Sequence, residues 1–102
     1  MKPTLFCIHG LWATPATFTG LKARFEAAGY PVVTPALPFH DRDPSLPPPP
    51  GLGDVTIEDY ARFLVAEIER IAGPVILVGH SMGGMLSQIV AARLPHAGLV
   101  LM

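Results

Sequence analysis

Cysteine and charge are both scarce in this sequence. The one cysteine, Cys7, cannot form a disulfide within the chain, and it lies in an apolar run without a metal-ligating partner at a familiar spacing. A buried, unreactive thiol is the favoured interpretation, and we expect no metal site. Seven basic and eight acidic side chains leave a formal charge of -1. The chain therefore has no electrostatic patch for nucleic acid or for an anionic membrane.

Long hydrophobic runs are also missing, although 50% of the 102 residues are hydrophobic. The apolar runs at 5–8 and 75–78 are typical, and none is long enough to cross a bilayer. No signal peptide follows Met1, so we expect a cytoplasmic protein. The length predicts a single domain, residues 1–102.

The short apolar runs alternate with segments of helical periodicity. The expected strands are 4–8, 30–35, 75–78 and 97–102, and the expected helices are 14–28, 56–71 and 82–94. Strands and helices in this order require right-handed crossovers between parallel strands. The predicted fold is therefore an α/β fold of three layers, in which a mostly parallel sheet of about four strands has helices on both faces.

Local signals place the ends of these elements. Thr14 followed by Pro15 opens the first helix, and residues 56–59 resemble a capping box at the start of the second. Two prolines within 30–35 favour an outer strand, because proline cannot donate a backbone hydrogen bond. Residues 37–53 are predicted to be a loop. The expected core faces are Phe18, Leu21, Phe25 and Ala28 on the first helix, and Ile57, Tyr60, Ala61, Leu64, Ile68 and Ile71 on the second.

A serine stands between the third expected strand and the third expected helix, in Gly79-His80-Ser81-Met82-Gly83. The pattern G-x-S-x-G in this setting is typical of a nucleophile elbow. A tight, strained turn lifts the serine hydroxyl above the sheet, and the small residues let neighbouring backbone approach. Serine is also a favoured helix cap, so a purely structural turn is the alternative. The strand before and the helix after favour a nucleophile at Ser81.

These motifs resemble the α/β-hydrolase family over nearly the whole chain. The resemblance rests on His9-Gly10 after the first strand, on Gly79 to Gly83 after the third, and on the helices between them. It implies that the backbone N–H groups of Leu11 and Met82 form an oxyanion hole. Such donors stabilise the negative charge that acyl transfer builds on a carbonyl oxygen.

The residues around these two donors are large and apolar. The resemblance leaves Trp12 as a substitute for Leu11 in the oxyanion hole. The side chains of Leu11, Trp12 and Met82 are suited to an apolar wall for an acyl group, and ordinary core packing explains them equally well.

A base that could activate the serine is what the sequence lacks most clearly. In the family the acid and the histidine follow the serine, whereas here only His96 follows Ser81 and no Asp or Glu does. The resemblance assigns His9 and His80 to orienting loops. His96 is expected at the end of the sheet opposite the serine.

His40 is the remaining candidate base. It lies beside Asp41 and Asp43 in the loop after the second strand, on the edge of the sheet expected to carry Ser81. A solvated loop histidine is the alternative. The simplest expectation is an N-terminal portion of a longer hydrolase, truncated after the strand that begins near Ala97. A small protein that works as an assembly is the next.

Two classes of function fit this sequence. The first is a serine hydrolase that acts on small carboxylic esters or related acyl substrates, is weak or inactive in this short form, and needs no metal or organic cofactor. The second is a non-catalytic binding or assembly module that retains the elbow. The resemblance also leaves lyases, peroxidases and acyltransferases open. Because the last strand would present unpaired backbone groups, we expect a homo-oligomer that joins through this edge.

Overall fold

The computed structural model describes residues 2–102 and contains four strands, three α-helices and two 3-10 helices. The strands are β1 (Thr4–Ile8), β2 (Val32–Val33), β3 (Val75–Gly79) and β4 (Gly98–Leu101). The helices are η1 (Pro15–Phe18), α1 (Thr19–Ala27), η2 (Leu52–Asp54), α2 (Ile57–Glu69) and α3 (Met82–Ala91). Within residues 2–102, no helix combines the length and the apolar character that crossing a membrane requires.

The strands form one parallel sheet in the order β2-β1-β3-β4. The two central strands pair along their full length, from Thr4 opposite Val75 to Ile8 opposite Gly79. Their near-continuous apolar sequences are typical of strands that are buried on both faces. The predicted parallel α/β sheet of four strands is confirmed, and so is the outer position of β2.

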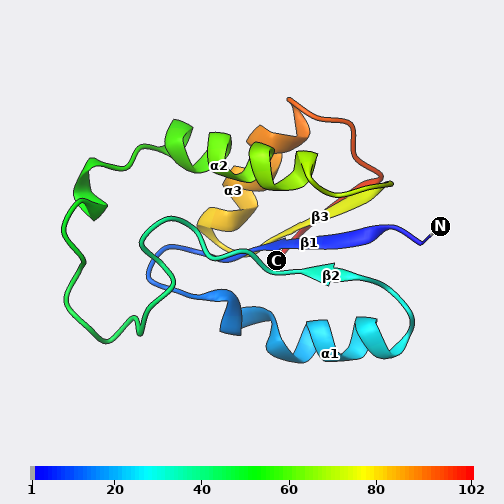
Figure 1. Ribbon diagram of the computed structural model, residues 1–102, viewed down its shortest axis with the longest axis horizontal. Coiled ribbons are helices and arrows are strands. Elements are labelled where there is room, and N and C mark those ends of the chain that lie inside the picture. Colours follow the sequence, from blue (N-terminus) through cyan, green and yellow to red (C-terminus); the bar gives the residue numbers. More distant parts are fainter. Residues whose placement is uncertain (1) are drawn as a thin grey trace.

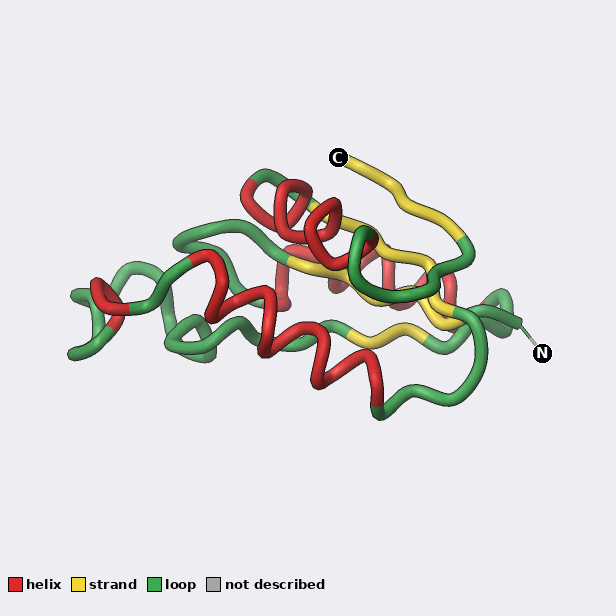
Figure 2. The backbone as a smooth tube through the Cα atoms, turned by 90° about the horizontal axis from the view of Figure 1, so that it is seen from above, coloured by secondary structure: helices red, strands yellow, loops and turns green. Residues whose placement is uncertain are grey.

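Helices cover both faces of this sheet. Figure 1 shows α1 on one side of the strands and α2 with α3 on the other. Figure 2, seen from above, shows α2 and α3 side by side over the strands, and these two helices contact each other. Because α3 also contacts β1, β3 and β4, its N-terminus is held against the centre of the sheet. The three-layer prediction is confirmed.

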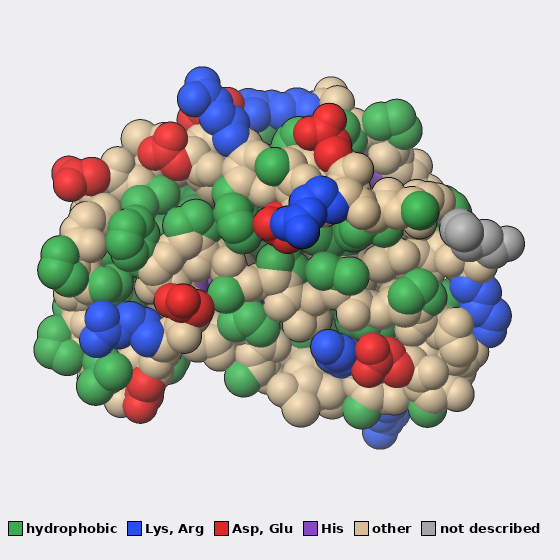
Figure 3. All heavy atoms as spheres, in the orientation of Figure 1, with side chains coloured by type: hydrophobic (Ala, Val, Ile, Leu, Met, Phe, Trp, Pro, Cys, Tyr) green, Lys and Arg blue, Asp and Glu red, His purple; other side chains and the backbone are tan. Residues whose placement is uncertain are grey.

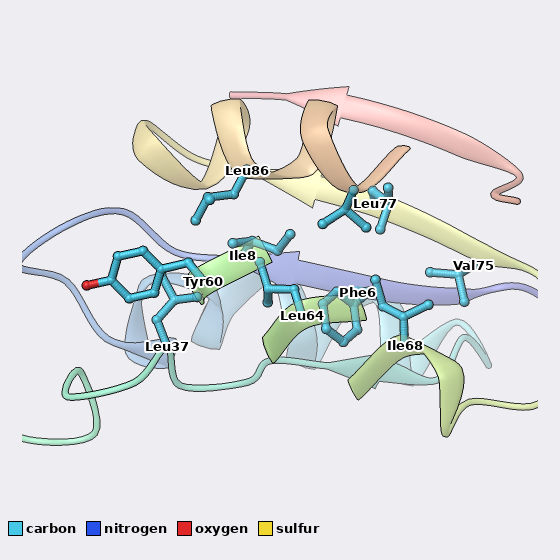
Figure 4. Close-up of a cluster of buried hydrophobic side chains, with 10 residues drawn as sticks. Phe6, Ile8, Leu37, Tyr60, Leu64, Ile68, Val75, Leu77 and Leu86 are labelled. Carbon is cyan, nitrogen blue, oxygen red and sulfur yellow. The ribbon is translucent and has the colours of Figure 1, made fainter. Parts of the chain in front are cut away.

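Alternate residues of β1 supply the two halves of the core. Phe6 and Ile8 point toward α2 and α3, where Figure 4 shows them among Leu64, Ile68 and Leu77. Leu5 and Cys7 point to the opposite face and pack with Phe18, Val32 and Val78. This division follows from the alternation of side chains along a strand. Cys7 is fully buried, and burial raises its pKa to about 11, so the thiol is protonated and unreactive at neutral pH.

The predicted helix starts are confirmed at the level of single hydrogen bonds. At α2, the backbone N–H of Asp59 donates to Thr56 Oγ1 at 3.1 Å, and the backbone N–H of Thr56 donates to Asp59 Oδ2 at 2.9 Å. At η1, Thr14 Oγ1 accepts from the Ala16 N–H at 3.2 Å. Gly29, with φ at 91°, ends α1 in the left-handed conformation that glycine permits.

Three residues assigned to helical core faces are exposed instead. Phe25 and Ile57 are each 39% exposed, and Ala28 is exposed as well. No residue of α1 is buried, and β2, the strand that α1 contacts, is only two residues long. Phe25 packs edge-on against the ring of Tyr30, with 5.8 Å between ring centroids. Ile57 stands at the first turn of α2, facing a cavity described below.

The helix predicted at 14–28 is divided into η1 and α1, and the other helices and the two outer strands are shorter than predicted, most clearly in two cases. The strand expected at 30–35 is reduced to Val32–Val33, because its flanking prolines have no N–H to donate to a ladder. The helix expected at 82–94 ends at Ala91. A tighter turn follows it, in which the N–H groups of Arg93 and Leu94 both donate to the carbonyl of Val90 at 2.9 and 3.0 Å.

Candidate active site

Ser81 occupies a strained turn between β3 and α3. Its backbone has φ at 58° and ψ at -123°, and its side chain is exposed. A residue other than glycine in such a conformation costs on the order of 1–3 kcal/mol, which the surrounding structure must supply. Ser81 is the N-cap residue of α3, yet its side chain makes no capping hydrogen bond. The hydroxyl of Ser81 therefore does not cap α3, and the alternative of a purely structural capping serine does not fit this turn.

Two glycines allow this turn to sit deep against the sheet. A Cβ added to Gly83 would collide with the carbonyl oxygen of Ile8 and would lie 2.7 Å from the carbonyl oxygen of His9. A Cβ added to Gly79 would collide with the carbonyl oxygen of Gly83. The backbone of α3 therefore touches β1 and β3 directly, as the sequence predicted for small residues around Ser81.

The loop after β1 reaches the same serine from the other side. A Cβ added to Gly10 would lie 3.1 Å from Ser81 Cβ and 3.5 Å from Ser81 Oγ, so the Gly10 backbone lies directly beside this side chain. The N–H of His80 donates to the carbonyl of Ile8 at 3.1 Å, which fixes the turn to β1. The structure thus brings together the two motifs that the sequence singled out, around 9–10 and around 79–83.

Both ring nitrogens of His9 are engaged. Nδ1 lies 2.8 Å from the carbonyl oxygen of Gly10, and Nε2 accepts a hydrogen bond from the Leu37 N–H at 3.1 Å. The Nδ1 atom must therefore carry the proton and donate to Gly10. Burial lowers the pKa of His9, the hydrogen bond to Gly10 opposes this shift, and nearby His40 adds to it. A neutral His9 ties the loops after β1 and β2 together, which leaves no free nitrogen for another proton transfer.

Of the two residues predicted as oxyanion donors, Met82 follows Ser81 directly, and Leu11 follows Gly10, whose backbone lies beside Ser81. Met82 opens α3, and Leu11 lies in a tight turn closed by a 3.3 Å hydrogen bond from the Ala13 N–H to the Gly10 carbonyl. Among residues 2–102, the N–H groups of Leu11 and Met82 donate to no backbone carbonyl. A helix N-terminus carries unpaired N–H groups and a partial positive charge, which suits a developing oxyanion.

Trp12 occupies an unusual position in the same turn. Its φ is 59°, a left-handed conformation for a bulky residue, and its indole is 51% exposed. The turn therefore directs the indole outward rather than into the core.

His40 is buried, contrary to the alternative of a solvated loop histidine. Its side chain is 4% exposed and its ring centroid lies 5.4 Å from that of His9 and 6.0 Å from that of Tyr60. Nδ1 lies 2.9 Å from the Pro38 carbonyl oxygen, while Nε2 is buried and has no hydrogen-bond partner among residues 2–102. The lone pair of one ring nitrogen is thus not used by any hydrogen bond in the part of the chain that the structure describes.

The two aspartates beside His40 do not complete a catalytic triad in the described residues. Asp43 accepts hydrogen bonds from the backbone N–H and the hydroxyl of Ser45, at 2.9 and 2.8 Å, and these bonds lower the pKa of its carboxyl. Asp41 is exposed. Within residues 2–102, no hydrogen bond joins His40 to either aspartate or to Ser81.

The other two histidines lie on the surface. His80 is exposed beside Ser81, within the turn. His96 precedes β4 with Nδ1 at 3.1 Å from the Leu94 carbonyl oxygen, at the end of the sheet opposite the serine. Within residues 2–102, no group of three or more His, Cys, Asp or Glu side chains is arranged to hold a metal ion.

An apolar cavity of about 470 Å³ opens beside the predicted oxyanion donors. Its lining comes from the turn after β1, the loop before α2, and the first turns of α2 and α3: Leu11, Trp12, Pro48, Leu52, Gly53, Val55, Ile57, Tyr60 and Met82. The sequence predicted the part contributed by Leu11, Trp12 and Met82 but missed the opposite wall. The available signal was the presence of Leu52 and Val55 at the end of an otherwise polar and proline-rich loop.

A parallel α/β sheet with a strained, exposed serine between a strand and a helix defines the class of this protein. The chain belongs to the α/β hydrolase family, whose model matches residues 5–102. It is 32% identical over 95 residues to a pimeloyl-[acyl-carrier protein] methyl ester esterase of Aromatoleum aromaticum, which covers 93% of this chain and 34% of the esterase.

Solved structures agree with this family. The thioesterase domain from the curacin biosynthetic pathway superposes with a TM-score of 0.86 at 28% identity, over 99% of this chain and 37% of that domain. A pyrethroid hydrolase from Sphingobium faniae superposes with a TM-score of 0.79 at 31% identity, over 99% of this chain and 39% of the hydrolase. The chain therefore spans about a third of the curated esterase and somewhat more of the solved hydrolases.

Proposed function

We propose that this chain carries the nucleophile and the oxyanion hole of a serine hydrolase that acts on carboxylic esters or related acyl substrates. The observation that carries this proposal is the Ser81 turn. A strained backbone holds an exposed hydroxyl between the Gly10 backbone and the N-terminus of α3. A turn that served only to start a helix would have no need of this strain.

The proposed reaction is acyl transfer through the serine. Ser81 Oγ attacks the carbonyl carbon of the ester and gives up its proton to a base, while the N–H groups of Leu11 and Met82 hold the oxyanion. The tetrahedral intermediate collapses as the bond to the alcohol oxygen breaks, the base returns its proton to that oxygen, and a neutral alcohol leaves the acyl-serine. Water then attacks the acyl-serine, releasing the carboxylic acid and restoring the hydroxyl.

His40 is the base that we propose for residues 2–102. Its buried Nε2 has no hydrogen-bond partner there, and His9 is already saturated. Without an acid to orient this histidine, we expect slow turnover. An oxyanion hole and substrate binding alone accelerate the reaction on the order of 10³–10⁴-fold over the uncatalysed rate. The relatives, which include an ester esterase, a thioesterase and a pyrethroid hydrolase, support an acyl substrate.

A fluorophosphonate probe tests this proposal directly. The probe should label the purified chain at Ser81, as read by peptide mass spectrometry. The Ser81→Ala variant should lose all labelling, whereas Ser45→Ala, which removes another exposed serine, should keep it. Labelling that persists in Ser81→Ala would overturn the assignment of the nucleophile.

A binding or assembly module is the second candidate. The observation in its favour is that His40 contacts neither Ser81 nor an aspartate by hydrogen bonds among residues 2–102. This candidate predicts an intact fold by circular dichroism together with a complete absence of labelling by the probe.

A further inference from the structure

The wall that faces the predicted oxyanion donors belongs to the loop between β2 and α2. Pro48, Leu52 and Val55 of this loop line the same cavity as Leu11 and Met82. Figure 3 shows hydrophobic side chains gathered at the end of the molecule where this loop lies. The cavity therefore reaches the two residues that follow Gly10 and Ser81 in the sequence, and it offers mainly apolar contacts to a ligand.

Internal contacts hold this loop in place. The N–H groups of Leu52, Asp54 and Val55 donate to backbone carbonyls within the loop, at 3.3, 3.1 and 3.2 Å. Gly51 has φ at 92° and lies against the ring of Phe39, where an added Cβ would be 3.2 Å from Phe39 Cζ. Pro47–Pro50 further limits the backbone. The wall is thus largely pre-formed, which reduces the entropy lost when a ligand binds.

Trp12, Pro48 and Leu52 line both this cavity and a smaller one next to it. The smaller cavity, of about 20 Å³, is lined by Trp12 together with Phe39, His40 and Leu46. Trp12 is also the single tryptophan of the chain. Its fluorescence therefore reports binding in either cavity without any added label, and variants of residues that line only one of them distinguish the two.

We propose that the loop at 44–55 makes this a hydrolase of apolar acyl esters, with Leu52, Ile57 and Trp12 as the side chains that select the acyl chain. This inference rests on the proposed function, because the cavity can hold an acyl chain for hydrolysis only if Ser81 is the nucleophile. Ile57 fits this role in particular: it is the first residue of α2 and is half-exposed, so its side chain is available to a ligand. Selection follows from burial, because each methylene group removed from water is worth about fourfold in affinity.

Tryptophan fluorescence of the Ser81→Ala variant gives a test that needs no catalysis. We expect methyl octanoate to shift the Trp12 emission in a saturable manner. Methyl acetate should give no saturation at the same concentrations, a difference of at least about 50-fold if three methylene groups are buried. Both probes are neutral, so charge does not enter the comparison.

Ile57→Asp is the decisive variant, made in the same Ser81→Ala background. It places a charge in the cavity wall, while an acidic residue in the first turn of a helix is compatible with folding. We expect methyl octanoate to bind at least tenfold more weakly. The matched control is Leu46→Asp, a change at an exposed residue of the loop at 44–55 that lines the smaller cavity but not the larger one. It should bind methyl octanoate as the parent does.

Three results would overturn the proposal: no saturable change with methyl octanoate, equal effects of the two esters, or equal binding by Ile57→Asp and Leu46→Asp. These outcomes are distinct from failure of the proposed function. If the fluorophosphonate labels Ser81 but methyl octanoate does not bind, the proposed acyl pocket is refuted and the assignment of the nucleophile stands. If methyl octanoate binds selectively but the probe does not label Ser81, the acyl pocket is supported and the proposed hydrolase activity is refuted.

Discussion

Gly83 and Gly84 stand next to each other in α3, and the structure predicts opposite effects when each is replaced by alanine. A Cβ at Gly83 would collide with the carbonyl oxygen of Ile8 and lie 2.6 Å from its carbonyl carbon. A Cβ at Gly84 would meet nothing closer than 3.6 Å, which is ordinary van der Waals contact. The same change is thus overpacked at one position and accommodated at the next.

The size of the two effects can be estimated from the surroundings. Alanine in place of glycine within a helix contributes about 0.5–1 kcal/mol. Overpacking costs typically about 1–3 kcal/mol, and relief is difficult at Gly83 because the obstacle is the backbone of β1, which pairs with strands on both sides. We therefore expect Gly83→Ala to lower the free energy of unfolding by about 2 kcal/mol. Gly84→Ala should raise it by up to about 1 kcal/mol.

Thermal unfolding followed by circular dichroism measures both changes. For a domain of this size, about 2 kcal/mol corresponds to a fall of roughly 8–16 °C in Tm. Gly20→Ala in α1 provides a further control, because nothing lies within 4 Å of its added Cβ. If Gly83→Ala melts at or above the temperature of the parent, the close approach of α3 to β1 is wrong, and with it the geometry assigned to the Ser81 turn.

Three further predictions concern the histidines and the last strand. Burial lowers the pKa of His9 below its ordinary value of 6.5, so on acidification the unfolded chain takes up this proton before the folded chain does. The stability present above about pH 6.5 should therefore fall as the pH is lowered. Urea titrations at pH 7.5 and 5.5 should show a smaller loss of unfolding free energy for His9→Gln than for the parent. If His40 is the base, slow ester hydrolysis should rise as a histidine loses its proton between about pH 5 and 8, and an unchanged rise in His40→Ala would exclude it. We also expect β4, whose Leu99, Val100 and Leu101 are exposed, to pair with a second copy; a monomer by light scattering, or a Leu99→Lys variant that assembles as tightly as the parent, would refute this.

The features that sequence could predict are those fixed by neighbouring residues. The capping box at Thr56 and Asp59 and the left-handed end of α1 at Gly29 each depend on a few adjacent positions. The elbow around Ser81 is similar, because a strand, a small-residue turn and a helix follow one another directly. These local patterns have one low-energy conformation, so the order of elements already specifies the layers of the fold.

The features that sequence missed depend on residues far apart in the chain. His40 is buried because its ring packs beside His9 and Tyr60, residues 31 and 20 positions away, and nothing in the polar sequence around it indicates this. Ile57 has the spacing of a core residue, yet it reaches the cavity because a loop lies opposite it rather than the sheet. Periodicity says which residues share a face of a helix but not what covers that face.

The distribution of backbone strain gives an independent reason to place function at one edge of the sheet. Among residues 2–102, three residues other than glycine have positive φ: Trp12, Phe39 and Ser81. Each follows a strand, β1, β2 and β3 respectively, so all three lie beyond the carboxyl ends of the parallel strands. At the opposite edge, the left-handed positions before β2 and β3 are occupied by Gly29 and Gly73, which adopt that conformation without strain. A third left-handed glycine, Gly51, lies in the loop before α2, so glycine is used at both edges. The side chains of Trp12, Phe39 and Ser81 lie at the edge where open α/β sheets bind their ligands. The backbone strain at these three residues is better explained by what their side chains contact than by the path of the backbone.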